Sequence, residues 1–330
     1  MAFSDYDFLE EPVEELNVVT DWPEGKIDPR LARTSYSSEL TYHGCPRKYQ
    51  LRKLSATARV VEEWRGAMTL DFGSLLGEAI QGLIFGDSYE KVVILALSKW
   101  DAALFLENDK QKKSFWYLLH AIDMFQGHVE SGLLEDWEPV WFTNQHGDYV
   151  PATELGIKIK FPDGHAYRGY LDLVMKNKLT GLYAVMDVKS DSGAFIQPGK
   201  YKNSGQGIGY SAVLDKIAPG FTDFVVYYLV YLTKLERWEL LEFPKTRHQR
   251  ALWLRDRIWD QNSRSDLVRT EGNYGVWPMH GESCMSWNRE CEYMGVCDGN
   301  TKLLTKPLTV EDLVEDDSPF SFIYDVEELL

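Results

Sequence analysis

The sequence of 330 residues has no run of roughly eighteen apolar residues, the length that an α-helix needs to cross a bilayer. We therefore expect no association with a membrane. The first residues, Met1–Asp7, have neither a basic start nor an apolar stretch, so we expect no signal peptide and a cytoplasmic location. The motif Gly-x-x-x-x-Gly-Lys-Ser/Thr is also missing, which excludes the phosphate-binding loop of ATP-driven motors.

Basic residues are fewer than acidic residues, which gives a net charge of −16, but the excess of acid is confined to the two ends. Residues 1–24 hold eight acidic residues and no base, and residues 307–330 hold eight more and no base. Removing these 16 from the 51 acidic residues leaves 35, equal to the 35 Lys and Arg. A neutral body with local basic patches is compatible with a nucleic-acid groove and equally with ordinary solvated helix faces.

The periodicity of the sequence changes near residue 136. Before it, helical spacing predicts helices around residues 37–51, 72–85, 89–106 and 113–133. After it, strand-like runs lie at 139–143, 155–161, 167–175, 182–189, 221–232 and 236–243, with helices at 206–214 and 245–258. We expect an α/β fold with a central mixed β-sheet flanked by helices. Five regions follow: an acidic flexible arm over 1–34, a helical region over 35–135, an α/β core over 136–265, a cysteine-rich segment over 266–306 and an acidic tail over 307–330.

Two acidic residues interrupt neighbouring apolar strands. Asp172 and Asp187 lie on either side of the polar turn 176–181, which ends in glycine as in a β-hairpin. Strand side chains alternate, so Asp187 and Lys189 point to the same face. Two carboxylates and an ammonium group that converge there could bind a divalent metal and position a water. A simple cross-strand ion pair is the alternative.

The order Gly169-x-x-Asp172, Asp187-x-Lys189 and Gln206-x-x-x-Tyr210 resembles the PD-(D/E)xK nuclease superfamily, specifically its RecB-like branch, over roughly residues 35–300. The resemblance implies a restriction-endonuclease-like core and hydrolysis of DNA with Mg²⁺ or Mn²⁺. It implies that Asp172, Asp187 and the backbone carbonyl of Val188 bind the metal. It also implies that Lys189 orients or deprotonates the attacking water, or stabilises the developing charge.

Further roles follow from the same resemblance. Gln206 and Tyr210, four apart on one helix face, are expected to support the site and contact DNA, and Lys200 and Lys202 to bind DNA. A surface Gln beside a half-buried Tyr is the alternative for that pair. The RecB-like branch usually has a metal-binding His on the helix before the sheet, and Glu78 stands at that place here. Other branches use Glu as this ligand, although Glu78 could also be an ordinary helix residue.

Four cysteines form the second motif. Cys45 stands alone, and Cys284, Cys291 and Cys297 follow as Cys-x₆-Cys-x₅-Cys. This resembles the four-cysteine [4Fe–4S] staple of AddB-type, CRISPR-associated and phage RecB-like exonucleases, which joins the N- and C-terminal regions. The x₆ gap departs from the family, where two residues are commoner. Zinc in the same thiolates is the runner-up. Two disulfides, which a reducing compartment disfavours, or unrelated buried thiols are further alternatives.

The resemblance therefore implies an exonuclease that acts on single-stranded or resected DNA ends in recombination, repair or phage DNA processing, in a bacterial or phage-infected cell. A catalytically silent DNA-binding or scaffold subunit with the same fold is the alternative. A third possibility is an iron–sulfur or zinc protein in which Asp187 and Lys189 form only an ion pair.

The acidic tail alternates acids with apolar residues. A solvated or loosely docked tail is one interpretation. It could instead bind a recombination or single-strand-binding partner, or cover a basic groove as a DNA mimic.

Overall fold

The computed structural model describes residues 26–55, 67–101, 104, 112–143, 147–161, 165–193, 195–217, 223–286, 289–299 and 320–323. The first 25 residues of the predicted arm and most of the predicted tail lie outside the described residues. Within the described part, no helix combines the length and the apolar character that crossing a membrane requires. The chain forms two compact units. The larger comprises Arg33–Leu40, Val61–Ser263 and Asp317–Leu330, and the smaller comprises Met1–Ala32, Thr41–Val60 and Arg264–Asp316.

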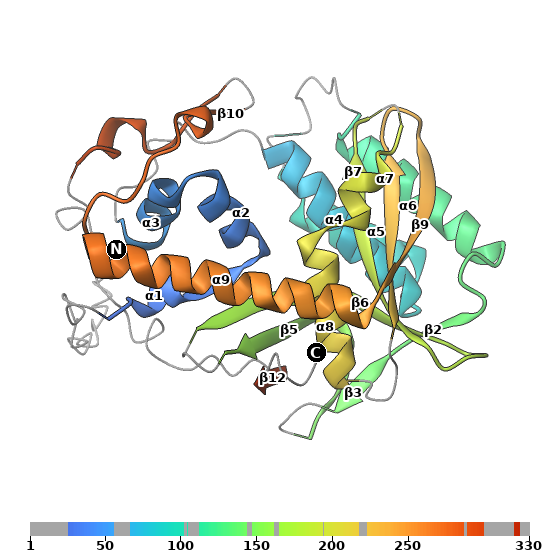
Figure 1. Cartoon of the computed structure of the whole chain (residues 1–330). Helices are drawn as coiled ribbons and strands as arrows, with labels where there is room; N and C mark the ends of the chain where they lie inside the picture. Colours follow the sequence, from blue (N-terminus) through green and yellow to red (C-terminus); the bar gives the residue numbers. More distant parts are fainter. Residues whose placement is uncertain are drawn as a thin grey trace, which may run out of the picture. The chain divides into compact units, whose positions relative to one another are not determined.

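A mixed β-sheet is the centre of the larger unit (Figure 1). Its strands are β5 (Thr153–Lys160), β6 (Ala166–Asn177), β7 (Tyr183–Asp191), β8 (Phe224–Leu232), β9 (Arg237–Lys245) and β12 (Phe320–Ile323), in the order β12-β5-β6-β7-β8-β9, with β1 (Arg33–Ser35) and β2 (Trp137–Pro139) also paired to β6. Strands β5 to β7 form an antiparallel meander, whereas β7 and β8 run parallel. A parallel pair needs a crossover connection. That connection contains α7 (Pro198–Lys202) and α8 (Gly205–Ile217).

Helices cover both faces of this sheet. On one face, α4 (Ala67–Ile84), α5 (Tyr89–Lys99) and α6 (Phe115–Glu130) bury their apolar stripes with Leu173, Met186 and Leu229. On the other face, α8 and the first part of α9 (Arg247–Glu271) pack with Leu171, Val185 and neighbouring side chains. The predicted mixed sheet flanked by helices is therefore confirmed. A separate hairpin, β3 (Trp141–Thr143) with β4 (Tyr149–Pro151), precedes β5.

The smaller unit brings together residues from the two ends of the chain. Its helices are α1 (Pro29–Ala32) and α3 (Pro46–Leu54), with the last turns of α2 (Tyr36–Gly44) and α9, the short helices η2 (Gly281–Ser283) and η3 (Met294–Val296), and the hairpin β10 (Met285–Ser286) with β11 (Arg289–Glu290). Tyr49 stacks on Trp277 with ring centroids 6.5 Å apart. The side-chain amide of Gln50 donates to the carbonyl oxygen of Asn273 at 2.7 Å. Ordinary packing and hydrogen bonds thus join these segments.

Two segments differ from the predicted regions. Residues 29–34 of the predicted arm, with Ser35, form α1 and β1, and β1 pairs in parallel with β6 from Arg33↔Ala166 to Ser35↔Arg168. Residues 320–323 of the predicted tail form β12, which pairs in parallel with β5. In both places the added strand satisfies backbone groups that a sheet edge would otherwise expose.

Three basic residues that belong to local clusters of Lys and Arg in the sequence do not face solvent. Arg47, Lys245 and Arg250 are fully buried. Lys245 donates to the backbone carbonyl of Lys202, and Arg250 lies over the ring of Phe224 and bonds the Lys245 carbonyl at 2.9 Å. Burial, assisted by the charge of Lys202, lowers the pKa of Lys245 to about 8.

We expect stability to depend on the ionisation of Lys245. The folded protein holds this proton more weakly than the unfolded chain, so the free energy of unfolding rises as the pH increases from about 8 towards 10.5. Lys245→Met should remove this dependence and stabilise the protein at pH 7 by up to about 3 kcal/mol. Urea unfolding between pH 7.5 and about 9.5, below the range in which tyrosines ionise, measures both effects. Lys234→Met, in the exposed turn after β8, is the control. An equal pH slope in wild type and Lys245→Met would contradict the assignment.

Candidate active site

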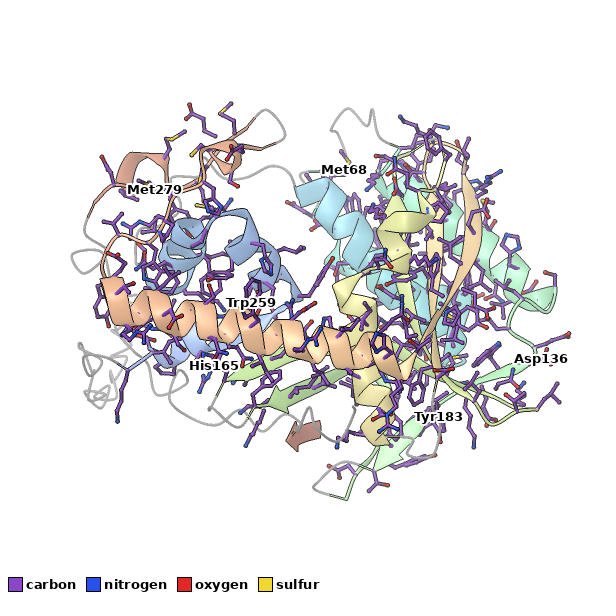
Figure 2. All side chains as sticks on the ribbon, viewed as in Figure 1. Met68, Asp136, His165, Tyr183, Trp259 and Met279 are labelled. Atoms are coloured by element: carbon purple, nitrogen blue, oxygen red, sulfur yellow. The ribbon has the colours of Figure 1, made fainter. Side chains whose placement is uncertain are left out.

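The hairpin of β6 and β7 places two aspartates opposite one another. The ladder runs from Lys176↔Tyr183 to Leu173↔Met186, so the next position on each strand is Asp172 and Asp187. The turn is fixed locally, because Asn177 Oδ1 accepts hydrogen bonds from the N–H groups of Leu179 and Thr180. The Lys178 N–H donates to the carbonyl of Asp136 at 2.8 Å, which joins the turn to the segment before β2. Asp136 is labelled at the right of Figure 2. The predicted hairpin therefore sets the register of the two carboxylates.

Asp187 is the buried member of the pair. It has no solvent exposure, and the Lys189 ammonium lies 2.8 Å from its Oδ1. Despite this ion pair, neither carboxylate oxygen of Asp187 has a hydrogen-bond partner of ordinary geometry among the described residues. A buried carboxylate with incomplete pairing is unfavourable, and a divalent cation would compensate it.

The ionisation of Asp172 reflects the same crowding. Burial, together with the adjoining Asp187 carboxylate, raises the pKa of Asp172 to about 8, although Lys189 and Tyr210 oppose the shift. Lys189 shows the complementary effect. Burial alone would lower its pKa, but the charges of Asp187 and Asp172 outweigh burial and raise it, which favours the ammonium form. Two hard carboxylates at adjoining positions of neighbouring strands are a suitable donor set for Mg²⁺ or Mn²⁺.

Helix α8 supports Asp172 through two side chains. The Gln206 amide donates to the Tyr210 hydroxyl at 2.5 Å, and that hydroxyl donates to Asp172 Oδ1 at 3.3 Å. Tyr210 is buried, and burial with the nearby aspartates raises its pKa, so it stays a protonated donor. The structure thus brings Asp172, Asp187, Lys189, Gln206 and Tyr210 together. Contact of Gln206 and Tyr210 with DNA remains a prediction.

Three further predicted residues are near the end of β7. Val188 lies between Asp187 and Lys189, and its side chain packs in the core with α4, so only its carbonyl is a predicted ligand. Lys200 and Lys202 on α7 are both exposed, and Lys200 forms an ion pair with Asp191 at 3.1 Å. Their exposure leaves them able to contact a phosphate backbone, which stays a prediction.

Glu78 on α4 is oriented differently from the two aspartates. It is half-buried and forms an ion pair with Lys99. Among the described residues, its carboxylate does not join those of Asp172 and Asp187 in a set of ligand atoms within 4.8 Å of one another. Its role as a metal ligand remains a prediction.

Sequence reasoning missed Glu154. In the β5–β6 ladder, Thr153 pairs with Leu173 and Leu155 with Leu171, so Glu154 stands opposite Asp172. Its φ of 45° is unusual for a residue other than glycine. Gln81 on α4 donates to Glu154 Oε1 at 2.9 Å. Glu154 is an exposed residue, but partial desolvation of its carboxylate, with the charges of Asp172 and Glu78, raises its pKa, and Gln81 opposes this shift. Three acidic residues therefore occupy matching positions on three adjacent strands.

The four cysteines all belong to the smaller unit and are all free. Cys45 is the N-cap of α3, the Cys291 N–H donates to the Cys284 carbonyl at 2.8 Å, and Cys297 follows η3. Burial raises the pKa of Cys297. The Arg47 guanidinium opposes this shift, and its Nε donates to the Cys297 carbonyl at 2.7 Å. The Ser283 hydroxyl donates to the Gly44 carbonyl at 2.6 Å, so the segments that carry Cys45, Cys284 and Cys297 lie side by side. No three of these four described thiols come within 4.8 Å of each other.

Comparison with known proteins gives three findings. A search of the curated proteins finds none that matches. A solved structure titled "Crystal structure of SSO0001" is similar at 13% identity with a TM-score of 0.26, and the match covers 63% of this chain and 93% of that one. A family model described as the PD-(D/E)XK nuclease superfamily matches residues 33–298. That match spans most of the chain, including both aspartates and all four cysteines. The chain belongs to the PD-(D/E)XK nuclease superfamily.

Proposed function

We propose that this nuclease is a metal-dependent DNA exonuclease that uses Asp172, Asp187 and Lys189. The observation that carries the proposal is the buried Asp187 carboxylate, which lies opposite Asp172 with both oxygens incompletely bonded. Asp172 and Asp187 would hold Mg²⁺ or Mn²⁺, which when bound supplies Lewis acidity towards the phosphate and acidifies a water. The catalytically silent scaffold is the second candidate, and no observation favours it.

Side chains of the protein would position the ligand oxygens, donate hydrogen bonds and bind the DNA strand. Gln206 fixes Tyr210, and Tyr210 fixes Asp172 Oδ1, so that this acceptor oxygen is held in place. Lys189 is held by Asp187, and its remaining N–H groups can donate to an attacking water or to a phosphate oxygen as negative charge develops. Lys200 and Lys202 are available to bind the backbone of the strand.

Hydrolysis should require both the buried carboxylate and the ammonium. Asp187→Asn and Lys189→Met keep the side-chain volume but remove a ligand charge or a donor, and each should lower the rate about 100-fold or more. End-labelled linear single- and double-stranded DNA with Mg²⁺ reports the rate, and chelation of the metal should abolish it. Asp256→Asn, on the exposed side of α9, is the matched control.

The same assay separates the candidate functions. An exonuclease degrades linear strands and spares covalently closed circles of the same sequence. Cleavage of closed circles would exclude exonuclease action alone. A wild-type protein that binds DNA and cuts neither form would instead establish the silent scaffold.

Tyr210 should act through Asp172. Tyr210→Phe removes only the hydroxyl that donates to Asp172. We expect a loss of metal affinity of about 10- to 100-fold, as for other residues that hydrogen-bond a metal ligand, and little change in stability. Titration of Mn²⁺ by calorimetry measures the affinity directly. Tyr170→Phe, on the exposed part of β6, is the control. Unchanged Mn²⁺ affinity in Tyr210→Phe would show that the contact is structural only.

We further propose that Cys45, Cys284, Cys291 and Cys297 hold a [4Fe–4S] cluster. A Zn–S bond of about 2.3 Å places tetrahedral thiolates about 3.8 Å apart. No three of the four described thiols lie within 4.8 Å of one another, a wider spacing than a single zinc ion requires, which favours a larger cluster. Buried Arg47 adds a positive charge beside them and bonds the Cys297 carbonyl at 2.7 Å.

Metal analysis of anaerobically purified protein tests this assignment. We expect a brown protein with about four iron atoms per chain. Cys297→Ser should lose both the colour and most of the iron, while Ser283→Ala, beside Cys284, should retain them. One equivalent of zinc with no iron would establish the zinc site instead.

A further inference from the structure

A pocket of about 590 Å³ lies between α4, α5, the β3–β4 hairpin and the start of β5. Its wall includes Glu78 and Gln81 from α4, Trp141 from β3 and Glu154 from β5. Glu154 stands opposite Asp172 in the β5–β6 ladder, and the charges of Asp172 and Lys189 act on it. One residue of the pocket wall is therefore the strand neighbour of the proposed metal ligand Asp172. Its volume exceeds that of any single nucleobase.

The charge of the wall determines what the pocket can accept. Its ionisable groups are all acidic: Glu78, Asp87 and Glu154. Glu78 is paired with Lys99, and Asp87 with Lys91 at 2.5 Å. Glu154 instead has the neutral amide of Gln81 beside one oxygen. Such a wall repels phosphate and favours a neutral group that donates hydrogen bonds.

Aromatic rings form the opposite part of the wall. The rings of Phe85 and Trp141 meet edge to face with centroids 5.6 Å apart, and Tyr149 stacks on Trp141 at 5.4 Å. Trp141 is 41% exposed and Tyr149 69% exposed, although both are large aromatic side chains. Exposed aromatic rings that are already held in place by one another are a favourable surface for a flat heterocycle.

We propose that this pocket receives the base of the nucleotide next to the scissile phosphate. The base packs against Trp141, and its exocyclic amino group donates to Glu154. The inference rests on the proposed nuclease function and specifies its substrate. A base can enter only when it is unpaired, so the substrate is a single-stranded end. Guanine, cytosine and adenine carry an exocyclic amino donor, whereas thymine lacks one and leaves the Glu154 carboxylate with Gln81 as its donor and none from the base.

Binding of short single strands to the full-length protein tests the proposal. The probes are labelled decanucleotides of one common sequence that differ only in having dG, dC, dA or dT at the end being degraded, with Ca²⁺ in place of Mg²⁺ so that equilibrium can be measured. Wild type should bind dT-ended strands at least 5-fold more weakly than the others. Glu154→Gln, which keeps the size of the side chain, should remove this preference.

Trp141→Ala should weaken binding of all four strands by about 5- to 100-fold, the effect of one stacked base. Trp141→Phe keeps a ring at this position and should retain most of the affinity, which separates stacking from a disturbed hairpin. Trp116→Ala is the control, because Trp116 is 69% exposed at the start of α6 and does not line the pocket.

Each result decides a separate point. If wild type binds and degrades DNA but Trp141→Ala binds as well as wild type, or the base preference survives in Glu154→Gln, the pocket proposal is wrong and the nuclease proposal stands. If wild type neither binds nor degrades DNA with Mg²⁺, the proposed function fails, and the pocket proposal fails with it.

Discussion

A carboxylate buried in the middle of a β-sheet is the constraint on which the larger unit depends. Asp187 follows the buried apolar residues Ala184–Met186 and precedes buried Val188, and it has no solvent exposure itself. Leaving such a group unpaired costs several kcal/mol. Lys189, two residues along the same face, provides one opposite charge at 2.8 Å. None of the described residues uses the remaining capacity of the two oxygens, so burial of this carboxylate lowers stability at a point where a bound cation would restore it.

The geometry of the neighbouring strands shows how a second carboxylate reaches this point without entering the core. In a regular strand, residues two apart share a face. Here Leu171 and Val174, three apart, lie in one cluster, whereas Leu173 lies in the cluster on the other face. Ala152, which directly precedes β5, and Leu155 on β5 also share a cluster although they are three apart. Asp172 and Glu154 lie where this alternation is broken, and the backbone of Glu154 has a positive φ there.

The parts of the site that depend on local patterns could be predicted from the sequence. The hairpin, the shared face of Asp187 and Lys189, and the four-residue spacing of Gln206 and Tyr210 follow from strand and helix periodicity. Glu154 could not be found in this way. Its strand, Thr153–Lys160, alternates polar and apolar residues like an ordinary half-exposed strand, and only the register with β6 reveals its position.

The same limit applies to other long-range contacts. The pairing of β12 with β5 and of β1 with β6 joins segments far apart in the chain, so no local pattern indicates it. Burial of Lys245 depends on the carbonyl of Lys202, which sequence spacing does not reveal. Counting Lys and Arg in the sequence therefore overestimates the number of basic groups on the surface, because composition does not separate a buried ammonium group from an exposed one.

Helix α4 connects the proposed catalytic carboxylates with the pocket beside them. Gly73, Gly77 and Gln81 recur at intervals of four and so lie along one side of this helix. A Cβ atom at Gly73 would lie 3.8 Å from Ser190 Oγ at the end of β7, and Gln81 bonds Glu154 on β5. Gly77, between them, has no neighbouring atom within 4 Å of its would-be Cβ. Glu78, one residue on, is turned towards Lys99. Among the described residues, this side of α4 therefore has room at Gly77 that a larger side chain would fill.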